Sequence, residues 1–527
     1  MHRGGGGVPT RVLFIGLDAA SAALIHRFTG EGAMPTFARL ERDGVLCRLE
    51  SPLRTLPGAI WPEISTGISG GMTGEFYHPG QIRTGEAHIR PLEESEIDPE
   101  RYFWVKASRA GRRVAAIDMP QTALLPELNG IQLCEWGLHD RNFRIASHPP
   151  GLLDEIRALY GDHPIQGRAC DTLASQDSLE MLLDGLLEGC RIKSDMLADL
   201  IGRESWDLFA CVFGEPHCAG HQLWHLIDKS HPEHPADTPA QLRDAMKRLY
   251  SAIDEGMGRL IAQAGPGATV IVLSSHGMGP YVGGTQLLPE VLSRLGMASV
   301  RDTPARRRLR TLHGKARYLP FGLKRLLRRA MGLGALRRAQ AGIGALLDPF
   351  VSPGTRAGAV NNNRCGAIRL NLKGREPFGS VAPGAEANAL IAELRAELLA
   401  LRQPGSGKTI IDSIISASEA FGPNHHPDVP DLMIRFRTDI GRIEACQSPR
   451  VGVVAAPINS PGYPRTGDHV PNTRLWAAGP GIAAGRRLPD GDVTDIAPTI
   501  LDLLGVPWGD GDGQALQLRN AGVPAAP

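Results

Sequence analysis

The stretch Trp206–His225, WDLFACVFGEPHCAGHQLWH, decides how the rest of the chain is interpreted. Its first eight residues are apolar, aromatic and β-branched, which predicts a buried strand. Glu215, His217, His221 and His225 follow that strand closely. If a helix begins just after the first histidine, the three histidines are four residues apart and share one face. Imidazoles and a carboxylate grouped after a buried strand indicate a transition-metal site, although surface histidines in a polar loop are the alternative.

Two other apolar runs also end in polar residues. Residues 11–18 read RVLFIGLD and end at Asp18, and residues 268–276 read ATVIVLSSH and end at Ser275 and His276. Runs rich in Val, Ile and Leu are typical of central parallel strands. In open α/β sheets the active site lies at the carboxyl ends of the strands. The sequence therefore predicts a layered α/β fold whose strand ends bring these side chains to one edge.

Strands and helices alternate along most of the chain. Period-2 and apolar runs predict further strands at residues 113–118, 131–135, 431–436 and 474–481. Helical periodicity predicts helices at residues 34–44, 152–160, 178–201, 239–264, 385–401 and 493–504. We find no internal repeat.

Length and composition set broad limits. A chain of 527 residues indicates two structural units, or one large domain with an insertion. The eight cysteines are scattered without a Cys-x-x-Cys pair, which favours free thiols in a reducing compartment. The first residues, MHRGGGGVP, lack the apolar core of a signal peptide, and no apolar run reaches membrane-spanning length. We therefore expect a cytoplasmic protein.

One segment is strongly basic although the net charge of the chain is only +1. Residues 301–338 hold eleven Arg and two Lys against one acid, Asp302. The simplest interpretation is a solvated helical face of a lid. The alternatives are a platform for an anionic membrane surface, through Arg306–Arg338, or for a polyanionic substrate. Proline and glycine divide the segment into short helices, so we expect no nucleic-acid partner.

Five ordered motifs together resemble the type I phosphodiesterase/nucleotide pyrophosphatase family of the alkaline phosphatase superfamily. They are FIGLD ending at Asp18, TLP with STG at residues 55–67, EPHCAGH at 215–221, LSSHGM at 273–278, and GDH ending at His469. The resemblance covers the first 300 residues and about the last 70. It implies a three-layer αβα sandwich with a mostly parallel central sheet, interrupted by an inserted lid.

The resemblance also implies a two-metal hydrolase, whose two cations stabilise the attacking and leaving oxygens at phosphorus. The ligands of one metal fall on His217, His221 and His469. The ligands of the other fall on Asp18, Ser275, His276 and the nucleophile, a Thr that corresponds here to Thr55. A metal-bound Thr hydroxyl can form a covalent intermediate that water then releases. Zinc is the expected metal, one or two ions per chain, with manganese as an alternative.

The sequence departs from the family pattern at three positions. His217 and Ser275 stand where the family has Asp, so the three-His set is neutral and the second set is weak in ligands. Thr55 lies eleven residues before Thr66 instead of nine, so that either two residues are inserted or the nucleophile is absent. Glu215 is a candidate to supply the missing charge, and Asp468 is a candidate partner of a ligated histidine.

These observations predict a metal-dependent hydrolase of a small phosphate ester, a diester or a pyrophosphate. The alternatives are a phosphomonoester or phosphonate hydrolase or a phosphotransferase on the same fold, and a catalytically degenerate relative that binds an anionic ligand or partner. We expect the catalytic core at 8–295 and 440–515, the inserted lid at 296–439, and disordered tails at 1–7 and 516–527.

Overall fold

The computed structural model describes residues 11–50, 60–76, 80–86, 90–138, 143–165, 176–298, 354–360, 362, 365–456, 465–482, 484–509 and 511–519. The chain divides into two compact units. The first is Met1–Ser69, Glu93–Tyr281 and Tyr463–Pro527, and the second is Gly70–Leu92 and Val282–Gly462. The predicted boundaries of core and lid stay predictions. The basic segment 301–338, the tail 1–7 and most of the tail 516–527 lie outside the described residues.

The first unit is built on a ten-stranded sheet with the order β19-β2-β18-β9-β1-β8-β5-β6-β7, in which β20 also pairs with β2. Its five middle strands, from β9 to β6, are parallel. Strands β18 and β7 are antiparallel to their neighbours. The strands are β1 Arg11–Leu17, β2 Val45–Glu50, β5 Val114–Ile117, β6 Gly130–Cys134, β7 Ala146–His148, β8 Leu208–Phe213, β9 Ala268–Ser274, β18 Thr473–Ala478, β19 Arg486–Arg487 and β20 Gly491–Asp492.

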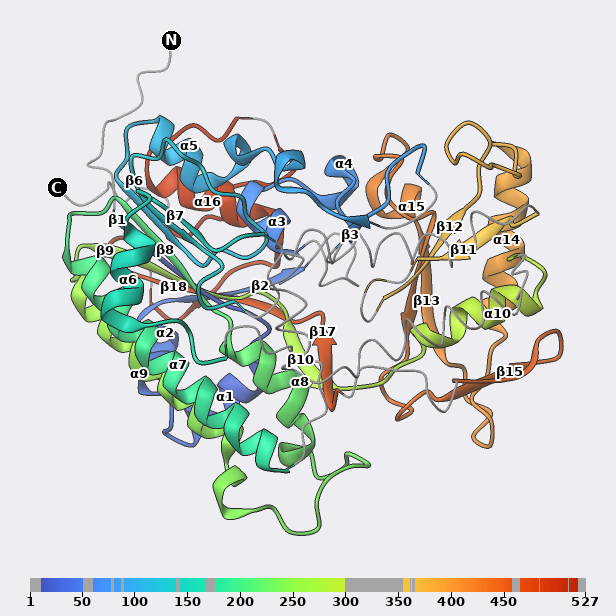
Figure 1. The fold of residues 1–527 in the computed structure, drawn as a ribbon, viewed down its shortest axis with the longest axis horizontal. Helices are drawn as coiled ribbons and strands as arrows, with labels where there is room; N and C mark the ends of the chain where they lie inside the picture. The colour runs from blue at the N-terminus through green and yellow to red at the C-terminus, as the bar shows by residue number, and fades with distance from the viewer. Residues whose placement is uncertain are drawn as a thin grey trace. The chain divides into compact units, whose positions relative to one another are not determined.

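Helices cover both faces of this sheet (Figure 1). Alternate residues of β1 point to opposite sides, so that Leu13 and Ile15 join one apolar cluster and Val12 and Phe14 join another. The first cluster holds α1 Ala22–Gly30, α2 Pro35–Asp43, α6 Leu152–Tyr160, α7 Gln176–Gly202, α8 Glu215–Ile227 and α9 Ala245–Ala264. The second holds α3 Ile60–Thr66, α5 Phe103–Arg109 and α16 Ile496–Leu503. The predicted three-layer αβα sandwich with a mostly parallel sheet is confirmed.

The second unit has its own antiparallel sheet, in the order β11-β12-β14-β13. One core cluster joins this sheet to helices α10 and α14. The main elements are α10 Leu288–Arg294, β11 Ala357–Ala359, β12 Gly366–Leu370, α14 Ala385–Leu399, β13 Ile411–Ser416, α15 Ala417–Phe421, β14 Leu432–Phe436, β15 Ala445–Ser448 and β16 Gly452–Ala455. The short elements α4 Gly70–Thr73, β3 Gly80–Gln81 and β4 Arg90–Pro91 belong to the same unit.

Two predicted helix boundaries are wrong. The predicted helix 239–264 begins as a short 3-10 turn, Ala240–Leu242, and is interrupted at Asp244, whose φ of 56° lies in the left-handed region that Asp tolerates. Helix α8 begins at Glu215 and not near Cys218, because Pro216 is well placed in a first helical turn. Among the described residues, no helix combines the length and the hydropathy needed to cross a membrane.

Candidate metal centre

The carboxyl ends of three neighbouring parallel strands meet at one edge of the sheet. The backbone N–H of Asp18, just after β1, donates to the carbonyl of Phe213 at the end of β8, at 2.9 Å. The backbone N–H of Ser275, just after β9, donates to the carbonyl of Leu17 at 3.1 Å. Helix α8 starts two residues after β8 ends. The predicted convergence of these three chain segments is therefore what the structure shows.

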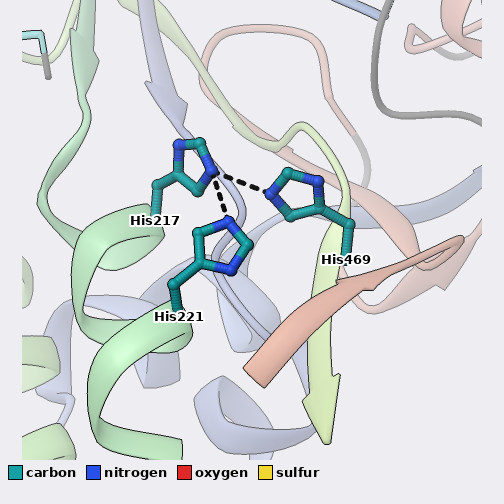
Figure 2. Close-up of side chains that lie close together, drawn as sticks. All are labelled: His217, His221 and His469. Carbon is teal, nitrogen blue, oxygen red and sulfur yellow. Dashed lines mark hydrogen bonds between the residues drawn. The ribbon is translucent and has the colours of Figure 1, made fainter. Parts of the chain in front are cut away.

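Helix α8 supplies two histidines to this edge. His217 and His221 are one turn apart and lie on the same face, as their spacing predicts. Their Nε2 atoms are 2.8 Å apart (Figure 2). His225, one turn further along, is not part of this group; its ring lies 6.2 Å from the ring of His231.

A short antiparallel ladder supplies the third histidine. Strand β10, Gly277–Pro280, pairs with β17, Gly467–Val470, and sets His469 opposite Met278. The chain can approach α8 closely because residue 467 is glycine: a Cβ there would lie 2.1 Å from the carbonyl oxygen of Gly220. As a result the Nε2 atom of His469 lies 2.8 Å from the Nε2 atom of His217 (Figure 2).

The protonation pattern of the three rings suits a cation. Asp18 Oδ2 lies 3.0 Å from His217 Nδ1, and the carbonyl oxygen of Gly467 lies 2.8 Å from His221 Nδ1. Both oxygens only accept, so they favour the tautomers that carry the proton on Nδ1. In the neutral rings the Nε2 lone pairs then point at one another. Burial, together with His276, His221 and His217, holds the pKa of His469 well below its usual value.

The three Nε2 donors therefore fit a divalent transition metal. Lone pairs that face one another without a proton repel, and a cation between them removes that repulsion. Neutral imidazoles are favoured ligands of zinc, and a three-His set leaves a coordination position open. In the described part of the chain, this is the one group of three whose ligand atoms all lie within 4.8 Å of one another. All three side chains are buried.

Asp18 and Ser275 form a hydrogen-bonded group beside the histidines. Asp18 Oδ1 accepts from the indole N–H of Trp61 at 2.8 Å and from the Ser275 hydroxyl at 3.3 Å. Burial opposes the charged form of Asp18, but His217, His276 and Trp61 together outweigh it and hold the pKa of the carboxyl well below its usual value. The Ser275 hydroxyl also accepts from the backbone N–H of Ala19 at 3.2 Å.

The remaining predicted residues have different positions. His276 lies next to His469, with ring centroids 4.3 Å apart, and its Nδ1 is 3.1 Å from the Ser275 hydroxyl. Asp468 Oδ1 accepts the backbone N–H of His469 at 2.9 Å. Thr55, the predicted nucleophile, lies outside the described residues. The roles predicted for these side chains stay predictions.

Glu215 belongs to a separate buried cluster. Its Oε1 lies 3.1 Å from His163 Nε2 and 3.9 Å from Lys193 Nζ. Lys193 Nζ also lies 3.0 Å from Asp118 Oδ2. Burial disfavours the charge on Glu215, but Lys193 and His163 outweigh it and lower its pKa. Because residues two apart in a helix lie on nearly opposite sides, Glu215 points away from the face that carries His217.

The sequence interpretation missed Asp118, Lys193 and His163. For Asp118 a signal existed, since it ends the predicted strand 113–118 just as Asp18 ends the first strand. Lys193 offered no signal, because a charged residue in an amphipathic helix is normally exposed. Trp61 appears within the second motif, but nothing in its position indicated a contact with Asp18.

Comparisons with known proteins give one family. The model of the family described as type I phosphodiesterase / nucleotide pyrophosphatase matches residues 12–440. No curated protein matches the sequence significantly.

Solved structures that resemble the chain include three of one kind. The inactive murine ectonucleotide pyrophosphatase/phosphodiesterase 5 in complex with AMP has a TM-score of 0.48 and 12% identity. A second structure of murine ectonucleotide pyrophosphatase/phosphodiesterase 5 has a TM-score of 0.47 and 12% identity. The human protein has 0.48 and 11%. In each case the match covers 96% of this chain and 97% of the other.

Proposed function

The chain belongs to the type I phosphodiesterase/nucleotide pyrophosphatase family, and we propose that it is a metal-dependent hydrolase of phosphate diesters or pyrophosphates. The observation that carries the proposal is the convergence of the Nε2 atoms of His217, His221 and His469. Family membership supports the reaction class, and the donor set supports metal dependence. Thr55 is the proposed nucleophile. The proposed substrates are small phosphorylated molecules of the nucleotide class.

The side chains around the centre prepare it for a phosphate ester. A divalent cation bound there supplies Lewis-acid stabilisation of charge on phosphoryl oxygens. Because the three imidazoles are neutral ligands, they do not neutralise the charge of a bound cation, and this suits an anionic substrate. The buried carboxylate of Asp18 keeps the His217 ring oriented, and the burial of all three histidines limits water around them. Zinc is the proposed metal, with manganese as the alternative.

A second candidate function follows from the residues at positions 217 and 275. Both lack the carboxylate that the family pattern implies, and the Asp18 carboxylate already has His217, Trp61 and Ser275 around it. These contacts favour a degenerate relative that binds an anionic ligand without turnover. A phosphomonoesterase, a phosphonate hydrolase and a phosphotransferase differ from the main proposal only in the bond attacked. A cytoplasmic location stays a prediction.

One experiment separates these functions. Purified protein is analysed for bound metals and assayed against a panel of an aryl phosphodiester, a phosphomonoester and a phosphonate. His221→Ala tests the metal set, Thr55→Ala tests the nucleophile, and His225→Ala is the matched control on the same helix. Bound zinc or manganese, with diester turnover lost in the first two variants and kept in the control, is expected. Metal without turnover of any ester supports the degenerate relative, and turnover that survives Thr55→Ala refutes the nucleophile.

A further inference from the structure

The Asp18 carboxylate lies behind a metal-facing imidazole rather than among the ligands. His217 has two ring nitrogens: Nδ1 is 3.0 Å from Asp18 Oδ2, and Nε2 is 2.8 Å from the Nε2 atoms of both other histidines. The carboxylate and the cation-facing nitrogen are thus on opposite edges of one ring. Carboxylates in this position orient a ligand histidine and raise its basicity, and they are not themselves ligands.

The other oxygen of Asp18 is also engaged. Trp61 donates its indole N–H to Oδ1 at 2.8 Å, and the Ser275 hydroxyl lies 3.3 Å from the same oxygen. A second cation bound at Asp18 would have to displace these donors from a buried carboxylate, and each buried donor that loses its acceptor destabilises the folded protein.

Ser275 does not offer what a second cation needs. Its hydroxyl is neutral, accepts the N–H of Ala19 at 3.2 Å and lies 3.1 Å from His276 Nδ1. A cation taken out of water into this buried group would face a single carboxylate, Asp18, whose oxygens already contact His217, Trp61 and Ser275. Buried charges without a matching partner are strongly disfavoured. Hydrogen bonds therefore fill the place where the sequence predicted a second metal.

We infer that the centre binds a single divalent cation through the three histidine Nε2 atoms, and that Asp18 is a positioning residue for His217, held in turn by Trp61 and Ser275. The inference rests on the proposed metal dependence and goes beyond it by fixing the number of ions and the role of Asp18. It also removes Asp18 and Ser275 from the ligand set that the family resemblance implies.

The test measures metal rather than activity. Protein stripped by chelation is titrated with zinc, and bound zinc per chain is measured by elemental analysis in wild type, Asp18→Asn and Ser275→Ala. We expect one ion per chain in all three, with zinc bound about 10- to 100-fold more weakly by Asp18→Asn. X-ray absorption of zinc-loaded Asp18→Asn is expected to show the same nitrogen ligands as wild type. If the Asp18 carboxylate were a ligand, the ligand set would change in this variant.

A matched control separates positioning from general destabilisation. Asp254 is as buried as Asp18, but its carboxylate accepts the backbone N–H groups of Thr36 and Phe37 at the start of α2. Asp254→Asn is expected to leave zinc affinity unchanged. Two ions per wild-type chain, falling to one in Asp18→Asn or Ser275→Ala, would overturn the inference and leave the proposed hydrolase standing. No bound ion in wild type would overturn both this inference and the proposed metal dependence. Equal zinc affinity in Asp18→Asn and wild type would refute the positioning role of Asp18 alone.

Discussion

Replacing Lys193 by Met tests the buried cluster behind the metal centre. Lys193 lies in α7, is fully buried, and places its ammonium group 3.0 Å from Asp118 Oδ2 and 3.9 Å from Glu215 Oε1. It also donates to the carbonyl of Val212 at 3.0 Å. Met fills nearly the same volume without the charge. The substitution therefore leaves two buried carboxylates without their shared cation.

The distances give the size of the effect. With an effective dielectric constant of about 20, the two charge pairs attract with roughly 5.5 and 4 kcal/mol. Most of this is offset in the wild type by the desolvation of three charged groups, but removing one partner of a buried ion group costs about 3–5 kcal/mol. That is a large part of the roughly 5–15 kcal/mol by which folded proteins are stable. At about 2–4 °C per kcal/mol, the expected fall in Tm is roughly 6–20 °C.

The assay is urea unfolding followed by tryptophan fluorescence, with chelator present so that lost metal binding is not counted. Lys247→Met is the matched control, because Lys247 forms an ion pair with Glu31 in which both side chains are about one-third exposed, and its loss should have little effect. The double variant Lys193→Met with Glu215→Gln should be destabilised by less than the sum of the two single variants, since one stranded charge is gone. A loss under about 1 kcal/mol for Lys193→Met, or strict additivity in the double variant, refutes the reasoning.

Three further predictions concern the first unit. Zinc at about 100 times its Kd should stabilise the wild type by about 2.7 kcal/mol, and thermal unfolding with and without chelator should show this stabilisation disappearing in His221→Ala. In Gly467→Ala the added Cβ would lie 2.1 Å from the Gly220 carbonyl oxygen, so this variant should separate β17 from α8 and bind zinc at least about tenfold more weakly in a titration. Gly30→Ala is the control, because a Cβ added at Gly30 would meet no other part of the fold within 4 Å, and its zinc affinity should not change. Burial raises the pKa of Asp492 to about 6, so the stability it contributes is full below the ordinary carboxyl pKa and is lost as the pH rises through 6. Asp492→Asn should therefore gain Tm relative to wild type between pH 4 and pH 8, and a constant difference across that range contradicts the prediction.

The elements predicted from the sequence are those whose pattern is long and local. The central strands β1, β8 and β9 are nearly continuous apolar runs, and every residue of β8 and β9 is buried. Such runs identify strands without knowledge of their neighbours. The ladder of β10 and β17 could not be foreseen, because each strand has four residues and each contains glycine. The break at Asp244 was equally hidden, since neither glycine nor proline marks it.

The candidate site divides in the same way. The spacing of His217 and His221 is enough to place them on one helical face. His469 came only from the family resemblance, because 248 residues of chain separate it from the second of those histidines and nothing local points to its partners. The orientation of Glu215 depends on where α8 begins, and a shift of three residues in that boundary moves its carboxylate from a loop beside the metal to the opposite side of the helix.

Histidine in place of aspartate at position 217 explains why the three-histidine set and the group around Asp18 and Ser275 differ. An imidazole reaches the other histidines with one nitrogen and Asp18 with the other, whereas a carboxylate at the same position has no proton to give to Asp18 and would repel it. With His217 present, the negative charge of Asp18 is stabilised by contacts with a ring nitrogen, an indole N–H and a hydroxyl. A second cation is then no longer needed to keep that carboxylate ionised in a buried place. The serine at position 275 is consistent with this change, because an additional carboxylate there would lie next to Asp18 and repel it.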